Sequence, residues 1–425
     1  MSKISEKIYI PVLFFLLVQM FISNELFWAL GMVCALYFLF HDRFRLVLPF
    51  KEYRMLFVFM VWGIFLGLFI IGRLDTSLRD YLRDIFYYST PIIYIYLGAC
   101  YARKQIKTSR ILNSFIVSSA MISVIYLIRI IQQGAVFLAN SDIHGWRLIS
   151  GGGTIVIGVS LAIHLSDIIE PEDRLPRFWS ITCFLISGLF FVLSLSRTNL
   201  LIVMIMSFVL FLKRKNSKKT AKRFLLIIVA VFAFVILTVV LLPEGFVKGY
   251  STKILNSFTE IKTTNEWNDV TIQSNWRGYE NYCALEQWKD ASLFVQIMGS
   301  GFGRRIYVGD YAFRYLSQRY SDGSPASSIA VLHNGYATHL IKLGLLGVIM
   351  YVVFYLCMIK KAWALSSRTK TMEARLLLAV SLTLVFQTYF LNGLFRDYCY
   401  YPFILLLGYA GYKAVRMQDE CSILQ

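Results

Sequence analysis

The strongest constraint on this chain of 425 residues is a series of long apolar segments. An α-helix needs about 20 apolar residues to cross the hydrocarbon of a bilayer. Twelve segments reach or approach that length: 8–23, 25–41, 54–72, 84–101, 111–131, 149–167, 178–196, 198–212, 224–242, 336–359, 376–391 and 400–413. The composition agrees, since 57% of the residues are hydrophobic and 16% are charged, against about 25% charged in soluble domains. These values exclude a soluble chain and a disordered one. We expect an all-α polytopic membrane protein with about twelve transmembrane helices.

Basic residues predict which connections face the cytoplasm. Twelve spans place both termini on one side, and three basic connections fall on that side: 102–110, 213–223 and 360–375. Basic loops are retained in the cytoplasm, so we expect both termini there. The net charge of +18 then reflects cytoplasmic loops, and we expect no nucleic-acid partner.

One connection is much longer than the others. Residues 243–335 separate nine predicted spans in 1–242 from three spans and a short cytoplasmic tail in 336–425, and they fall on the extracytoplasmic side. This connection holds nine basic and nine acidic residues, so the net positive charge lies outside it. Connections of this length usually carry structure of their own. The apolar spacing over 275–290 predicts an amphipathic helix on the outer face.

Three polar positions near the expected outer face are candidate site residues. Arg197 lies between two apolar segments, where it would extend towards the lipid headgroups or bind an anion. Arg277 lies on the predicted loop helix, where it would pair with Glu280 or bind a phosphate through two parallel hydrogen bonds. His333, followed by Asn334, directly precedes a long span. Its imidazole is suited to act as a general base near neutral pH.

Other polar residues have simpler explanations. Arg79 and Arg83 lie one helical turn apart, and we expect Asp80 and Asp84 to neutralise them. His339, inside the span after His333, is expected to be packed or hydrogen-bonded. The sequence has no P-loop and no Cys/His cluster with zinc spacing, and its outer loops lack the paired acids that often hold a divalent cation. We therefore expect a reaction that needs no metal and no cofactor.

Together these residues resemble the motifs of the bacterial O-antigen ligase and O-antigen polymerase superfamily. Residues 333–347 fit the family's pattern of His-Asn, nine residues and Gly-x-x-Gly. Residues 197–201 fit its Arg-x3-Leu pattern, and Arg277 resembles its loop arginine. The layout is similar too, with about twelve spans and one large periplasmic loop before the span that carries the histidine.

The resemblance implies a multi-pass glycosyltransferase of the bacterial inner membrane that acts at the periplasmic face. Its donor would be a glycan on undecaprenyl diphosphate, and its acceptor a sugar hydroxyl. That hydroxyl would belong to the lipid A-core for a ligase, or to another lipid-linked repeat unit for a polymerase. His333 would remove the proton of the hydroxyl, while Arg197 and Arg277 would neutralise the diphosphate in place of a metal. Further candidates for a supporting role are Asn334, Arg79 and Arg83.

Two alternatives remain at this point. The complete His-Asn pattern and the long loop favour a ligase over a polymerase, but a host without an outer membrane would reverse that preference. A polysaccharide flippase or secondary transporter would also suit twelve spans. Transporters usually carry repeat symmetry and charges at the membrane midplane, whereas here the candidate groups gather at one face.

Overall fold

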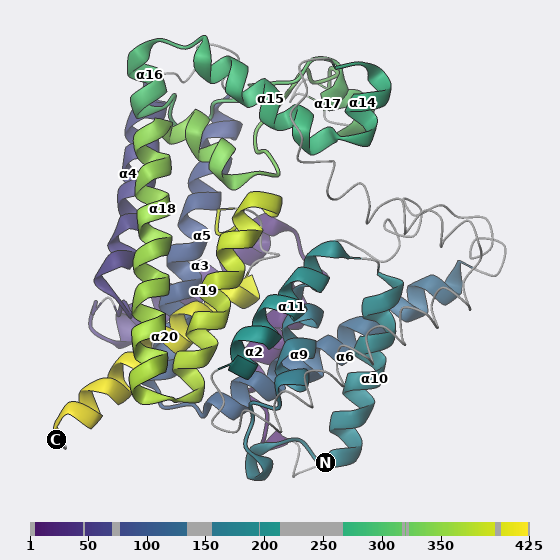
Figure 1. Ribbon diagram of the computed structural model, residues 1–425, viewed down its shortest axis with the longest axis vertical. Helices are drawn as coiled ribbons and strands as arrows, with labels where there is room; N and C mark the ends of the chain where they lie inside the picture. Colours follow the sequence, from purple (N-terminus) through teal and green to yellow (C-terminus); the bar gives the residue numbers. More distant parts are fainter. Residues whose placement is uncertain are drawn as a thin grey trace.

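The regular structure is almost entirely helical, as the sequence predicts. The computed structural model describes residues 5–45, 47–69, 77–133, 155–194, 196–212, 267–316, 319, 323–395 and 401–423. Within these residues the only sheet has two short antiparallel strands, β1 (Ile306–Tyr307) and β2 (Ser328–Ile329). Figure 1 shows long helices side by side, with several short ones at one end.

Eleven of the twelve predicted segments coincide with helices. These are α2 (Ile10–Val18), α3 (Asn24–His41), α4 (Arg54–Leu68), α5 (Leu78–Arg103), α6 (Thr108–Gln132), α9 (Ile155–Ser166), α10 (Arg177–Leu193), α11 (Arg197–Leu212), α18 (Gly335–Thr369), α19 (Met372–Leu391) and α20 (Tyr401–Ile423). Two single turns of 3₁₀ helix, η1 (Lys51–Tyr53) and η2 (Pro171–Asp173), lie in connections. The remaining predicted segment, 224–242, lies outside the described residues.

Within the described part of the chain, four helices are long and apolar enough to cross a membrane: α3, α6, α18 and α19. Three shorter apolar helices accompany them. The number of twelve spans therefore stays a prediction. Several helices also extend beyond the apolar segments. The Ser77 side chain accepts a hydrogen bond from the Asp80 amide and starts α5 six residues before the predicted span. Hydropathy marks the part of a helix that avoids water, whereas polar caps decide where the helix begins.

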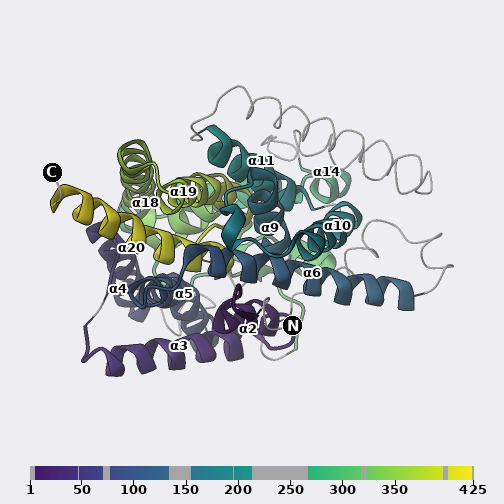
Figure 2. The same ribbon diagram turned by 90° about the horizontal axis from the view of Figure 1, so that it is seen from below.

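The long helices pack in two neighbouring groups, which Figure 2 shows from one end. In one group α5 lies along α20, α3 and α4, and α18 and α19 lie beside α20; in the other, α9 contacts α6, α10 and α11. The α11 helix joins the groups by packing against α19. The approach of α5 to α20 is close, since a Cβ at Gly408 would lie 2.1 Å from the carbonyl oxygen of Ile95. This backbone contact leaves room only for glycine.

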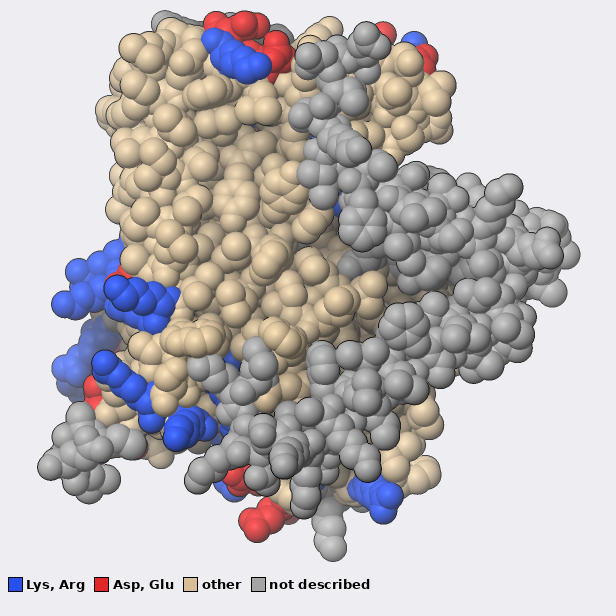
Figure 3. Space-filling view, in the orientation of Figure 1, with Lys and Arg blue, Asp and Glu red and all other residues tan. Residues whose placement is uncertain are grey.

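The described residues between 267 and 335, which we call the cap, fold at one end of the bundle (Figure 1). The cap contains α14 (Asp269–Ser274), α15 (Trp276–Lys289), α16 (Leu293–Met298), β1, α17 (Tyr311–Leu316) and β2. The helix predicted over 275–290 is present as α15. A separate hydrophobic cluster, which includes Ala284, Ile306 and Ala312, joins the cap to Ala337 and Ile341 of α18. Figure 3 shows many of the Lys and Arg side chains near the opposite end of the molecule.

A glycine-rich loop after α16 anchors the cap in the bundle. The Gly301 amide donates to the Lys342 carbonyl at 2.8 Å, and the Phe302 amide donates to the Gly63 carbonyl at 2.9 Å. The Phe302 side chain is fully buried. Gly301 has φ +83°, a conformation that residues with a Cβ rarely adopt. Gly344 has φ +71° and ψ −174° and kinks α18 where the loop meets it.

Candidate active site

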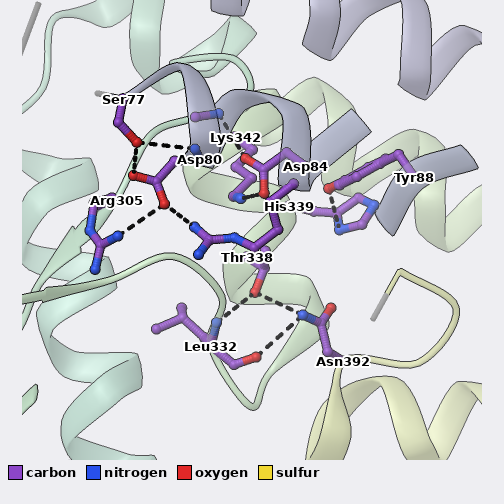
Figure 4. A network of polar contacts seen from close by, with 12 residues as sticks. Ser77, Asp80, Asp84, Tyr88, Arg305, Leu332, Thr338, His339, Lys342 and Asn392 are labelled. Carbon is purple, nitrogen blue, oxygen red and sulfur yellow. Dashed lines mark hydrogen bonds and ion pairs between the residues drawn. The ribbon is translucent and has the colours of Figure 1, made fainter. Parts of the chain in front are cut away.

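The backbone at His333 is held from several sides just before α18 begins. Asn334 is the N-cap of α18, and its side chain accepts hydrogen bonds from two amides of the first turn, at 3.0 and 3.4 Å. The Leu332 amide donates to Thr338 Oγ1 at 3.3 Å, and the Asn392 side chain donates to the Leu332 carbonyl at 3.3 Å (Figure 4). These hydrogen bonds fix the backbone on both sides of His333.

His333 is bound to a buried carboxylate of the cap. Its Nδ1 lies 2.9 and 3.0 Å from the two carboxylate oxygens of Glu280, and its backbone amide donates to Glu280 Oε2 at 3.0 Å. The Trp276 indole N–H donates to Oε1 at 2.6 Å. The Glu280 side chain is 1% exposed, whereas the imidazole is 25% exposed. A carboxylate accepts hydrogen bonds, so it selects the imidazole tautomer with the proton on Nδ1 and the lone pair on Nε2.

Arg277 belongs to the same helix as Glu280. It is half-buried and lies three residues before Glu280, so the two residues are neighbours on the surface of α15. The simpler interpretation of the sequence assigned Glu280 to Arg277 as an ion-pair partner. In the structure, the Glu280 carboxylate accepts hydrogen bonds from His333 and Trp276. The packing of α15 against α18 thus brings Glu280 to His333, and Arg277 lies within one helical turn of Glu280 on α15.

Arg197 is the first residue of α11, and its side chain lies outside the described part of the structure. The backbone of α11 nevertheless shows towards which end of the bundle its first turn points. Leu210, near the other end of α11, lines the same cavity as Thr371 at the start of α19. The C-terminal end of α11 therefore lies near the start of α19. Since the two helices also pack against each other, they run antiparallel. The first turn of α11 therefore points towards the end of the bundle where α19 reaches Asn392.

The acidic residues near the start of α5 have different partners. Asp80 forms ion pairs with Arg83 and with Arg305 of the cap, the latter at 3.0 Å. The predicted neutralisation of Arg83 by Asp80 is thus observed. Asp84 instead pairs with Lys342 of α18 and accepts a hydrogen bond from the Gly303 amide at 2.7 Å (Figure 4). Arg79 is exposed.

The second histidine of this region is a packed residue, as the sequence predicts. His339 is fully buried, and its ring stacks on Tyr351 with a centroid distance of 4.2 Å. Its Nδ1 lies 3.0 Å from the Gly335 carbonyl oxygen. His339 therefore stabilises the interior of the bundle beneath the cap.

Two titratable neighbours of Glu280 on α15 are neutral at physiological pH. Burial raises the pKa of the Cys283 thiol to about 11. Burial, and to a lesser degree the nearby Cys283, also raise the pKa of Tyr279. Neither group adds negative charge beside the Glu280 carboxylate near pH 7.

Neither the contact of Glu280 with His333 nor the ion pair of Lys342 with Asp84 was predicted from the sequence. Glu280 stood at the spacing of an ion pair with Arg277, and no local signal connected it to a histidine 53 residues later. Lys342 did leave a signal, because an ionisable residue inside an apolar span is rare and needs a partner. Among the described residues, no three His, Cys, Asp or Glu side chains gather in a way that could hold a metal ion. The expectation of a metal-free reaction stays a prediction.

Comparison with known proteins agrees with the motifs. No curated protein matches the chain. Residues 182–352 match the family model described as O-antigen ligase. The matched segment begins in α10, ends in α18 and contains Arg197, Arg277 and His333. Residues 182–352 are thus similar to the O-antigen ligase family, which supports the O-antigen ligase and O-antigen polymerase superfamily that the motifs predict.

Proposed function

We propose that this protein is a ligase-type glycosyltransferase that moves a glycan from undecaprenyl diphosphate to a sugar hydroxyl. The observation that carries the proposal is the contact of α15 with the start of α18. It joins His333 to Glu280, one helical turn from Arg277. The family match and the apolar helices support an integral membrane enzyme that acts on lipid-linked glycans. The proposed location is the inner membrane, with the cap on the periplasmic side.

In the proposed reaction the acceptor hydroxyl attacks the anomeric carbon of the donor glycan. His333 Nε2 takes the hydroxyl proton as the new C–O bond forms. The bond between the anomeric carbon and the diphosphate oxygen breaks, and undecaprenyl diphosphate leaves with the bonding electrons. A direct displacement of this kind inverts the anomeric carbon. The reaction needs no redox change and no covalent intermediate.

The leaving diphosphate requires neutralisation of its charge more than a proton. Arg277 is suited to this task because a guanidinium donates two parallel hydrogen bonds to phosphate oxygens. Arg197 is the second proposed diphosphate ligand. Asn334 would support the site by capping α18, and Arg79 and Arg83 by adding positive charge near it. The pair with Asp80 makes Arg83 the weaker candidate of those two.

The test is a gene deletion in the native host, complemented with wild type, His333→Ala or His41→Ala. His41 is exposed at the end of α3 and serves as the matched histidine control. The proposal expects long polymer to accumulate on undecaprenyl diphosphate in the deletion strain, with none on the final acceptor. Wild type and His41→Ala should restore transfer, and His333→Ala should not. Normal surface glycan from a well-expressed His333→Ala variant would exclude His333 as the base.

The same experiment distinguishes the alternatives. Single repeat units with loss of the polymer ladder would identify a polymerase, which shares the donor and the proposed chemistry. The similarity of residues 182–352 to the O-antigen ligase family supports the ligase. A transporter reconstituted in liposomes would move lipid-linked glycan across the liposome membrane without forming a glycosidic bond. An unchanged glycan pattern in the deletion strain would contradict both enzymatic roles in this pathway.

A further inference from the structure

We propose that Glu280 is a positioning residue that holds His333 in the orientation and tautomer of a general base. This inference rests on the proposed function, because it assigns Glu280 a role through His333. Glu280 contacts His333 twice, through the ring nitrogen Nδ1 and through the backbone amide. The two contacts fix both the ring and the chain that carries it.

The burial of Glu280 argues for a specific role. A carboxylate that is 1% exposed is costly unless hydrogen bonds compensate for its lost hydration. Docking of α15 does not need this charge, because an apolar cluster already joins Ala284 of α15 to Ala337 and Ile341 of α18. Burial of the carboxylate therefore costs free energy at an interface between α15 and α18 that hydrophobic contacts already form. The free-energy cost of burying Glu280 is accounted for if its carboxylate orients His333.

The chemical consequence follows from the two ring nitrogens. With the proton of Nδ1 donated to Glu280, Nε2 carries the lone pair that accepts the proton of the acceptor hydroxyl. The resulting imidazolium is stabilised by the adjacent carboxylate. The imidazole is a quarter exposed, so the ring is accessible from outside the cap while its Nδ1 side is bound to the carboxylate.

Trp276 completes the arrangement. Its indole N–H donates to Oε1 at 2.6 Å from one turn earlier on α15, and so fixes the rotation of the carboxylate. Without this donor the carboxylate would keep its contacts with the ring and backbone amide of His333 but would lose the hydrogen bond that fixes Oε1. Trp276→Phe is therefore expected to reduce transfer by a smaller factor than Glu280→Gln, because it removes a hydrogen bond but leaves the charge.

The first experiment measures the initial rate of glycan transfer in membrane vesicles from the deletion strain, which hold the accumulated lipid-linked donor. Glu280→Gln preserves shape, but its amide can donate to Nδ1 and so favour the wrong tautomer. We expect the rate to fall by at least about 10²-fold, within the range that general bases contribute. Glu286→Gln is the matched control, because Glu286 lies on the same helix and pairs with Lys289 at the surface. It should keep the wild-type rate.

A double variant separates positioning from a structural role. If Glu280 acts only through His333, then Glu280→Gln should not lower the residual rate of His333→Ala any further. A further drop in the double variant would show a role independent of His333 and overturn the proposal. Glu280→Asp keeps the charge and should retain more activity than Glu280→Gln.

A second measurement observes the His333 ring in the wild-type protein directly. ¹⁵N-histidine NMR of the wild-type protein in lipid should show that the neutral form of the His333 ring carries its proton on Nδ1 and not on Nε2. The chain has five histidines, so the His333→Ala spectrum assigns the signal. A His333 ring protonated only on Nε2 would overturn the positioning role.

Different results would refute His333 as the general base and Glu280 as its positioning residue. An active His333→Ala variant would remove the proposed base and with it the role of Glu280. An inactive His333→Ala variant together with a fully active Glu280→Gln variant would leave the proposed function intact and refute only the positioning role.

Discussion

Lys342 of α18 and Asp84 of α5 form an ion pair that is almost completely excluded from solvent, with side chains 0% and 1% exposed. The Gly303 amide donates to the same carboxylate at 2.7 Å, so the pair also binds the loop that anchors the cap. Three segments far apart in the sequence therefore meet at one charge pair (Figure 4).

Removing one charge of this pair should destabilise the protein strongly. Lys342→Met leaves Asp84 buried without its cation, which typically costs about 3–5 kcal/mol. Asp84→Asn combined with Lys342→Met removes both charges, and the asparagine can still accept from Gly303, so the double variant should recover much of the loss. Thermal unfolding in detergent, followed by size-exclusion chromatography, measures the order of stability. Equal melting temperatures for wild type and Lys342→Met would contradict this account of the pair.

Replacing Gly344 should also disrupt the anchor of the cap. Its φ of +71° and ψ of −174° lie in a region that is essentially restricted to glycine. A Cβ at this position would lie 2.3 Å from the Ile297 carbonyl oxygen. Gly344→Ala should cost about 3 kcal/mol or more, from strain and overlap together. Gly188→Ala is the control, because a Cβ there meets nothing within 4 Å. Similar yields and melting temperatures for both variants would show that the kink is not needed.

Arg277 should not tolerate replacement by lysine. Arg277→Ala is expected to abolish detectable transfer while leaving the protein in the membrane, and Arg277→Lys should restore little of it. A lysine ammonium is a point charge without the planar pair of donors that a diphosphate can use. Arg314→Lys on α17 is the matched control, since Arg314 is exposed and pairs with Asp269 within the cap. Transfer rates in membrane vesicles test the prediction, and wild-type transfer by Arg277→Lys would argue against bidentate binding.

The cap should face the periplasm, and cysteine labelling can test this. Helix α14 and the C-terminal end of α18 lie at opposite ends of the molecule (Figure 1). Gln273 on α14 and Arg368 near the end of α18 are both exposed. Each is replaced by Cys in a variant that lacks the seven native cysteines. In intact spheroplasts a membrane-impermeant maleimide should label Gln273→Cys, and it should label Arg368→Cys only after permeabilisation. The reverse pattern would place the cap in the cytoplasm and contradict the proposed donor side.

The class of protein and the position of most helices follow from the sequence, because the length of an apolar segment is a local property. The apolar spacing over 275–290 predicted α15, and the His-Asn and Gly-x-x-Gly pattern predicted the superfamily that the family model confirms. Helix ends were predicted less well. Ser77 starts α5 early and α18 continues to Thr369, since caps and polar turns extend helices beyond their apolar parts.

Partners of the charged residues depend on the tertiary structure. Asp84 lies one turn from polar residues of its own helix, yet its ion-pair partner is Lys342, and Glu280 binds His333 across 53 residues of sequence. The sequence determined which residues stand at the motif positions and which segments avoid water, because these are properties of residue type and spacing. Only the packing of α5, α15 and α18 decided which charges meet. A buried charge is stable beside whichever partner the fold brings within hydrogen-bonding distance, and that distance is set by helix packing rather than by separation along the chain.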